Sequence, residues 1–226
     1  MFFKTATLFL AAHALASPLD LDARQSGSCP KIHVFGARET TAPAGYGTAG
    51  TVVKLVTGAH SGATAEAIVY PACGGQSNCG GVSYTNSAQQ GTAAVVKTVN
   101  AYNAKCPDTE LVLVGYSQGG QIMDNAVCGG DDNKVGLSDA ALKMTKAVIL
   151  MGDPRHIAGL PYNVGSCQAS GFAPRPKGFR CPSADKVQSY CDSADPYCCN
   201  GNDKNAHQQY GNKYGQQALK FINSKL

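Results

Sequence analysis

The segment with the most chemical information is the run LVLVGYSQGG at residues 111–120. It contains Gly-x-Ser-x-Gly, formed by Gly115, Ser117 and Gly119, between an apolar stretch typical of a central strand and a helical pattern. In that setting the small flanking residues let the strand turn sharply into the helix and expose the serine as a nucleophile. The pentapeptide alone is weak evidence in a glycine-rich chain, so the strand and helix around it carry the interpretation. The alternative is a glycine-rich turn without chemistry.

A serine nucleophile needs a histidine base, and the histidine needs a carboxylate to orient it. In sheets of this kind the chain order is Ser, acid, His. Only His156 and His207 follow Ser117. His207 precedes the closing helical pattern, where a catalytic histidine is expected, whereas the nearest acid before His156 is three residues away in a turn. We favour His207, against the alternative of a capping or surface histidine.

Four aspartates are candidates for the acid: Asp153, Asp192, Asp195 and Asp203. Asp153 follows a predicted strand, but Asp-Pro is also common turn chemistry. Asp195 follows the next predicted strand within the run CDSADPYCC, where cysteines on both sides can immobilise it. Rigidity matters because the acid fixes the tautomer of the imidazole. We favour Asp195 over Asp192 mainly because Pro196 stiffens the backbone beside it.

Acyl transfer to serine also requires donors for the oxyanion. The amide of the residue after the nucleophile is one of them, and here that residue is Gln118, at the positive end of a predicted helix. A second donor usually comes from the loop after an early strand, at residues 36–41 in this chain. Thr40 or Thr41 could supply it, although polar residues are also ordinary in loops.

A competing motif is GYGTAG at residues 45–50, which matches the dinucleotide fingerprint and precedes a predicted helix. The preceding strand ends near Phe35, however, so a loop of about nine residues intervenes where the fingerprint needs an immediate tight turn. The next strand ends in Tyr70-Pro71 without an acid for the ribose. We therefore predict no nucleotide cofactor.

The elements that position these residues alternate between short apolar runs and longer helical patterns, which predicts an α/β domain with a largely parallel sheet. Residues 129–139 and 154–183 read as long loops. Strands are predicted at residues 31–35, 67–70, 110–114, 146–151 and 186–191, and helices at 48–56, 86–102, 117–128 and 210–224.

The N-terminus predicts secretion. Residues 1–16 carry Lys4, an apolar stretch too short to span a bilayer, and the small-x-small ending Ala14-Leu15-Ala16, which together are typical of a signal peptide. Residues 17–27 read as a propeptide and N-terminal tail, which leaves a single domain at residues 28–226. We expect no membrane partner, because no later stretch is long and apolar enough to cross a bilayer.

Ten cysteines in an oxidising compartment predict five disulfides, with a pairing that the sequence does not reveal. No Cys-x-x-Cys pair occurs, and adjacent Cys198 and Cys199 are poorly spaced for zinc, so we predict no metal. The net charge of +4 is spread without a basic run, which argues against nucleic acid. We expect a monomer.

The chain resembles the fungal acetylxylan esterases of the cutinase-like carbohydrate esterases over essentially its whole mature length. The residues that carry the resemblance are SCP and IHVFGARETT between residues 28 and 41, YPACGGQ at 70–76, GYSQGG at 115–120, DPYCCNG at 195–201, and His207. The resemblance implies a lidless three-layer α/β/α sandwich without a cofactor. It also implies Ser117 as nucleophile, His207 as base and Asp195 as orienting acid, with Thr40 and the Gln118 amide forming the oxyanion hole.

The sequence therefore predicts a secreted serine esterase that removes acetyl groups from acetylated xylan through an acetyl-serine intermediate. One rival is a cutinase, which performs the same chemistry on longer acyl chains, and another is a disulfide-rich carbohydrate-binding protein without catalysis. Tyr197, two residues after the favoured acid, is our candidate for closing the acyl side of the pocket. Its alternative role is to pack the loop of Cys198 and Cys199.

Overall fold

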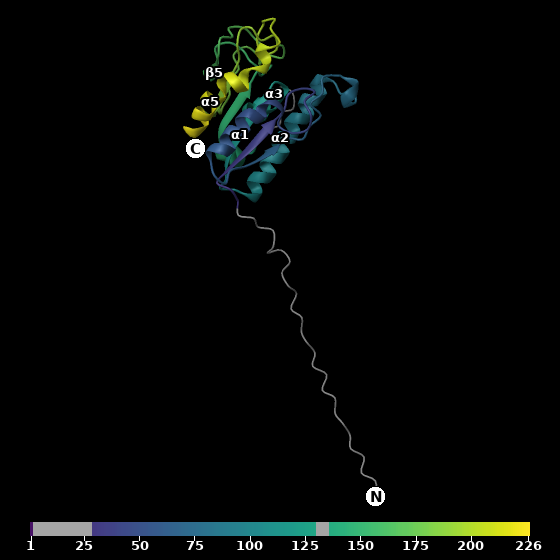
Figure 1. The fold of residues 1–226 in the computed structure, drawn as a ribbon, viewed down its shortest axis with the longest axis vertical. Helices are drawn as coiled ribbons and strands as arrows, with labels where there is room; N and C mark the ends of the chain where they lie inside the picture. Colours follow the sequence, from purple (N-terminus) through teal and green to yellow (C-terminus); the bar gives the residue numbers. More distant parts are fainter. Residues whose placement is uncertain (2–28, 130–135) are drawn as a thin grey trace.

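A computed structural model describes Met1 and residues 29–129 and 136–226 (Figure 1). The predicted signal peptide (residues 1–16) and propeptide (17–27) lie outside these residues, apart from Met1, and so does the middle of the loop predicted at 129–139. Within the described part of the chain, no helix combines the length and apolar character that crossing a bilayer requires.

The centre of the molecule is a six-stranded sheet in the order β2-β1-β3-β4-β6-β5, and every neighbouring pair is parallel. The chain moves from β1 to β2 on one side and then crosses to β3 on the other, so the direction of winding changes between β1 and β3. Ligand sites of open α/β sheets form at such a switch point, beyond the carboxyl ends of the strands. The strands are β1 (Ile32–Ala37), β2 (Thr64–Ala67), β3 (Glu110–Tyr116), β4 (Thr145–Met151), β5 (Asn163–Val164) and β6 (Val187–Tyr190).

Helices cover both faces of the sheet, as Figure 1 shows. Alternate residues of β3 explain why: Val112 and Val114 pack into one apolar core, and Leu111 and Leu113 into the other. The three-layer α/β/α prediction is confirmed. The first core lies under α1 (Gly50–Ala59) and α5 (Tyr210–Asn223), and the second under α2 (Tyr84–Lys105), α3 (Gln118–Cys128) and α4 (Asp139–Met144).

Most predicted elements occur within a few residues of their expected bounds, but the strand predicted at residues 67–70 is misplaced. The strand here is β2, at Thr64–Ala67, an edge strand that pairs only with β1 among the described residues. Ile68 and Tyr70, whose apolar character suggested the strand, are buried in the core beside α2 and α3 after the chain has left the sheet. The short elements α4 and β5 were not predicted, because neither is long enough to show a periodicity.

All ten cysteines form disulfides, which confirms the predicted count of five. Two of the bridges hold the long loop predicted at residues 154–183, one to the end of α3 and one to the loop after β6. The pairs are Cys29–Cys106, Cys73–Cys79, Cys128–Cys181, Cys167–Cys199 and Cys191–Cys198.

Candidate active site

Ser117 occupies the single residue between the end of β3 and the start of α3. Its backbone has φ 53° and ψ −120°, a conformation that costs a residue with a side chain about 1–3 kcal/mol and that persists only where the surroundings enforce it. The Ser117 N–H donates to the Met151 carbonyl of β4 at 2.8 Å, and its carbonyl accepts from the Gln121 N–H at 3.0 Å. The serine is thus held in a strained turn at the carboxyl edge of the sheet, as a nucleophile elbow requires.

The two glycines of the motif are required by close contacts between backbones. A Cβ atom on Gly115 would lie 2.3 Å from the carbonyl oxygen of Gly119, and one on Gly119 would lie 2.2 Å from the carbonyl oxygen of Ala37. Neither backbone can move away, because Gly115 belongs to the central strand and Ala37 ends the strand beside it. The Gly-x-Ser-x-Gly pattern is therefore the steric condition for bringing α3 against β1 and β3.

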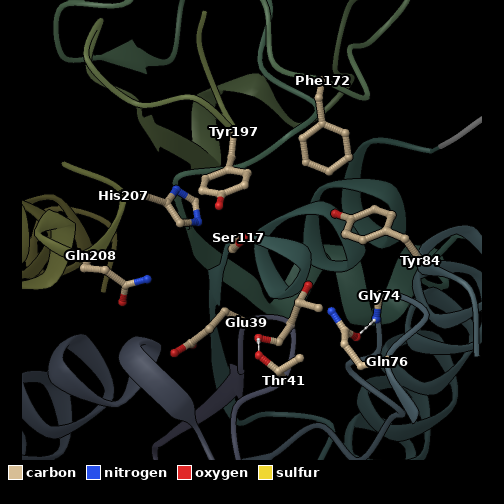
Figure 2. Close-up of a pocket in the computed structure, with 11 residues that line it drawn as sticks. Glu39, Thr41, Gly74, Gln76, Tyr84, Ser117, Phe172, Tyr197, His207 and Gln208 are labelled. Atoms are coloured by element: carbon tan, nitrogen blue, oxygen red, sulfur yellow. Dashed lines mark hydrogen bonds between the residues drawn. The ribbon is translucent and has the colours of Figure 1, made fainter. Parts of the chain in front are cut away.

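His207 and Asp195 form a buried pair beside the serine. His207 lies in a single 3-10 turn before α5, and its Nδ1 lies 2.7 Å from Oδ2 of Asp195. Ser117 and His207 line the same pocket, which has a volume of about 370 Å³. In Figure 2 one ring nitrogen of His207 points toward Ser117. The structure thus brings together the three residues that the sequence favoured for the triad.

The surroundings of Asp195 keep its carboxylate ionised. Oδ1 accepts from the N–H groups of Tyr197 (2.6 Å) and Cys198 (3.2 Å), and Oδ2 accepts from the Tyr210 hydroxyl (2.8 Å) as well as from His207. Burial by itself would raise the pKa of Asp195, but the hydrogen bonds from His207, Tyr197 and Tyr210 outweigh it and lower the pKa. An ionised Asp195 places the proton of His207 on Nδ1 and leaves Nε2 free to accept one.

Covalent and backbone restraints fix this pair. The disulfide Cys191–Cys198 closes a short loop around Asp195. The Tyr116 hydroxyl, at the end of the strand that leads to Ser117, donates to the His207 carbonyl. The histidine is therefore tied to the acid through its ring and to β3 through its backbone.

The other candidate acids have different partners. Asp192 forms an ion pair with Lys213 at 2.7 Å. Asp153 is buried at the end of β4, where it accepts a hydrogen bond from the Arg155 N–H of its own turn. Asp203 is exposed in the loop before His207 and accepts a hydrogen bond from the Asn205 N–H. None of the three hydrogen-bonds to the His207 ring among the described contacts.

The structure narrows the choice of oxyanion donors. Gln118 is the first residue of α3, so its N–H has no acceptor within the helix, while its side chain is buried and donates to the Cys73 carbonyl at 3.1 Å. Thr41 uses its N–H for the Ala72 carbonyl (2.7 Å) and its hydroxyl for the Thr40 carbonyl (2.6 Å). Both threonines line the pocket with Ser117, but Thr41 has committed both of its donors, so Thr40 is the better candidate.

The family model named Cutinase matches residues 28–226. The chain belongs to the cutinase family. It is 62% identical to Cutinase 11 of Verticillium dahliae, over 99% of this chain and 77% of that protein, and 57% identical to Acetylxylan esterase 2 of Talaromyces purpureogenus, over 100% and 98%. The catalytic core domain of acetyl xylan esterase from Trichoderma reesei superposes with a TM-score of 0.86 at 62% identity, over 88% of this chain and all of that chain.

The pocket of this cutinase-family protein has an aromatic side and a polar side (Figure 2). Tyr84, Phe172 and Tyr197 form the aromatic side, and the Tyr197 ring centroid lies 4.5 Å from that of His207. Sequence reasoning found Tyr197 but missed Tyr84 and Phe172, because no motif marks them and they come from distant parts of the chain. The polar side consists of Glu39, Thr40, Thr41, Gln76 and Gln208.

One cluster among the described residues has the spacing of a metal site: His156, Cys167 and Cys191, whose potential ligand atoms lie within 4.8 Å of one another. Both sulfurs are in disulfides, with Cys199 and Cys198. A disulfide sulfur carries no thiolate to bind a metal, so this cluster is not a metal centre in the oxidised protein.

Proposed function

We propose that this protein is a secreted serine esterase that removes acetyl groups from acetylated xylan. The observation that carries the proposal is the buried Asp195–His207 pair opening onto the pocket that holds the strained Ser117. Membership of the cutinase family and 57% identity to an acetylxylan esterase over both whole chains support the activity and the substrate. The predicted signal peptide and the full pairing of the described cysteines support secretion.

The reaction proceeds through an acetyl-serine intermediate. The Ser117 hydroxyl attacks the acetyl carbonyl while Nε2 of His207 takes its proton, and the Asp195 carboxylate stabilises the resulting imidazolium. The oxyanion accepts hydrogen bonds from the Gln118 amide and from Thr40. When the tetrahedral species collapses, His207 returns the proton to the leaving sugar hydroxyl. Water then attacks the acetyl-serine by the same steps, releasing acetate and restoring the serine.

The shape of the pocket favours acetate over longer acyl groups. A long acyl chain needs contiguous apolar walls, since each buried methylene contributes about 0.8 kcal/mol. Here the aromatic side faces polar residues across the pocket, and Tyr197 stands against His207 next to the reacting serine. In our proposal Tyr197 closes the acyl side. A cutinase remains the second candidate, because a relative of 62% identity carries that name.

The test is a series of p-nitrophenyl esters from acetate to octanoate, together with acetate release from acetylated xylan. We expect rates to fall sharply beyond about four carbons, and Ser117→Ala to lower kcat by several orders of magnitude. A wild type that prefers octanoate would identify a cutinase. A folded protein that binds xylan and hydrolyses none of the esters would identify a binding protein.

A second variant tests Tyr197 itself. Tyr197→Ala should gain on the longer esters relative to acetate, because the space that the ring vacates can bury additional methylenes. Tyr197→Phe is the matched control, since it keeps the ring and should keep the acetate preference. If folded Tyr197→Ala shows the same dependence of rate on acyl length as the wild type, Tyr197 only packs the loop of Cys198 and Cys199.

A further inference from the structure

Phe172 is an apolar ring held at the surface beside the nucleophile. It is 53% exposed, and it lines the pocket that contains Ser117. A single exposed apolar side chain is ordinary on a protein surface, but Phe172 lines the pocket together with Tyr84 and Tyr197, so it belongs to a contiguous aromatic surface on which a ligand can bind.

The backbone around Phe172 is fixed on both sides. Its own N–H donates to the Tyr197 carbonyl at 3.1 Å, the Gly171 N–H to the His156 carbonyl at 3.0 Å, and the Ala173 N–H to the Pro154 carbonyl at 3.2 Å. The exposed ring therefore stands on a segment that is hydrogen-bonded residue by residue. A ligand that meets it pays little entropy to order it, because the ring is already positioned.

Tyr84 supports the ring from the start of α2. The two ring centroids lie 5.1 Å apart at 69°, an edge-to-face arrangement, and the Tyr84 hydroxyl donates to the Gln121 side chain at 2.8 Å. The pair lines the pocket of Ser117 and also a second hollow of about 250 Å³. The aromatic pair thus borders two hollows, and Figure 2 shows it beside the one that contains Ser117.

The chemistry of the pocket selects an amphipathic, flat ligand. Opposite the aromatic pair stand the polar side chains of Glu39, Gln76 and Gln208. A hydrocarbon chain lying between the two sides would desolvate those polar groups without giving them partners. A xylopyranose ring has C–H groups on its faces and hydroxyls along its edge, so it can place a face on the electron-rich aromatic ring and its hydroxyls among the polar side chains.

We propose that Phe172, packed against Tyr84, binds a sugar ring of the xylan backbone next to the acetylated one. This inference rests on the proposed function. The stacking positions the polymer so that the acetyl group reaches Ser117. Phe172 has this role only with the polysaccharide as substrate, because p-nitrophenyl acetate has no neighbouring sugar to stack.

The experiment compares two substrates in each variant. In Phe172→Ala we expect the ratio of kcat/KM on acetylated xylan to kcat/KM on p-nitrophenyl acetate to fall about tenfold, which corresponds to about 1.4 kcal/mol. The loss should appear in KM for xylan, and the inhibition constant of deacetylated xylo-oligosaccharides should rise by a similar factor. Phe172→Trp should keep the ratio, because it keeps an aromatic face.

Val69→Ala is the matched control, since Val69 is an exposed apolar residue, 85% accessible, outside both hollows. It should leave the ratio unchanged. An unchanged ratio in folded Phe172→Ala would overturn the inference and leave the esterase proposal intact. A loss on octanoate esters instead of on xylan would also overturn it, by making Phe172 an acyl wall. If the wild type hydrolyses neither acetylated xylan nor p-nitrophenyl acetate, the proposed function itself is wrong.

Discussion

The loops that follow β4 and β6 begin at the same edge of the sheet, and each carries a buried aspartate and a buried histidine. After β6, Asp195 binds His207. After β4, Asp153 stands three residues before His156, and neither ring nitrogen of His156 has a hydrogen-bond partner among the described residues. The two pairs have nearly equivalent positions in the fold, but only Asp195 and His207 are hydrogen-bonded to each other.

The difference lies in the donors that each loop supplies. Burial raises the pKa of Asp153, and the nearby charge of Asp124 raises it further. Burial also lowers the pKa of His156 to about 4, so this histidine stays neutral. Asp195 is buried as well, yet the hydrogen bonds aimed at it lower its pKa. Burial at a strand end therefore favours the neutral form of a carboxyl group unless the loop provides donors for the ionised one.

The largest expected effect separates the two aspartates by activity. Asp195→Asn should lower kcat/KM on p-nitrophenyl acetate by about 10⁴, because the amide no longer fixes the tautomer of His207 or stabilises its charged form. Asp153→Asn keeps the shape and an acceptor for its turn, so we expect activity within about tenfold of wild type. Steady-state kinetics on both folded variants provide the measurement. The reverse order of effects would assign the acid to Asp153.

The next effect concerns the stability of the β4 side. Arg175 forms a buried ion pair with Asp124 at 2.6 Å. Arg175→Met would leave Asp124 buried without its partner, which costs about 3–5 kcal/mol of unfolding free energy in urea denaturation. The double variant Asp124→Leu/Arg175→Met should recover most of that loss, because it removes both charges. If the double variant is as unstable as the single one, packing rather than charge accounts for the loss.

Removing the Cys191–Cys198 disulfide from the loop after β6 should lower stability less than the Arg175 variant does, but should lower activity strongly. Replacing Cys191 and Cys198 by serine opens the loop around Asp195, and the chain-entropy cost for so short a loop is about 2–3 kcal/mol. Activity should fall further than this loss of stability explains, because the N–H groups that hold Asp195 lose their restraint.

The control for this variant is the replacement of Cys29 and Cys106 by serine. Their disulfide closes a much longer loop, with a separation of 77 residues, at the opposite end of β1 from the site. It should cost more stability, about 4–5 kcal/mol, with little change in kcat where the protein is folded. Equal losses of kcat in the two cysteine variants would contradict a specific role for the Cys191–Cys198 bridge.

These contrasts show what the sequence could specify. The turn at Ser117 was predictable because its cause is local: two glycines four residues apart, Gly115 and Gly119, remove clashes in one turn. Chain order reduced the candidate histidines to His156 and His207, and the position of His207 before the closing helix favoured it. Asp195 could be favoured over Asp153 on the rigidity of its loop, but the side chains that distinguish the two, His207 and Tyr210, reach Asp195 only in the folded chain.

The remaining features depend on contacts between distant segments. Tyr210, which donates to Asp195, and Phe172, which stands beside Tyr84, have no sequence motif that marks them. The disulfide pairing has the same origin, since ten cysteines allow many connectivities and only the fold chooses one. The misplaced strand at residues 67–70 arose because apolar residues there are buried by helices rather than by sheet pairing.

The smallest expected effect tests the donors of Asp195 directly. Tyr210→Phe removes the hydroxyl that donates to Oδ2 of Asp195 and accepts the Asp192 N–H at 2.9 Å. A hydrogen bond to a charged group contributes about 1.5–3 kcal/mol, so we expect a loss of about 2 kcal/mol in unfolding free energy at pH 7. Urea denaturation at pH 7, 5 and 3 provides the measurement.

The pH dependence of this stability difference follows from the direction of the Asp195 pKa shift. Because the folded pKa of Asp195 is lowered, its ionised form contributes stability that is fully present above the unfolded value of about 3.9 and is lost as the pH falls through the folded pKa. Removing the Tyr210 hydroxyl moves the folded pKa up toward the unfolded value. The difference between wild type and variant should therefore be constant from pH 7 to about pH 5 and shrink as the pH falls below about 4.

Tyr214→Phe is the matched control on the same helix. Tyr214 donates to Asp192 at 2.8 Å, but Asp192 keeps its ion pair with Lys213, so the expected loss is smaller, about 0.5–1 kcal/mol. The larger effect at Tyr210 would show that the donors around Asp195 set its charge state. An equal loss for Tyr210→Phe at pH 3 and pH 7 would instead mean that the hydroxyl contributes through packing and neutral hydrogen bonds, and the contrast between the β4 and β6 loops would then rest on geometry alone.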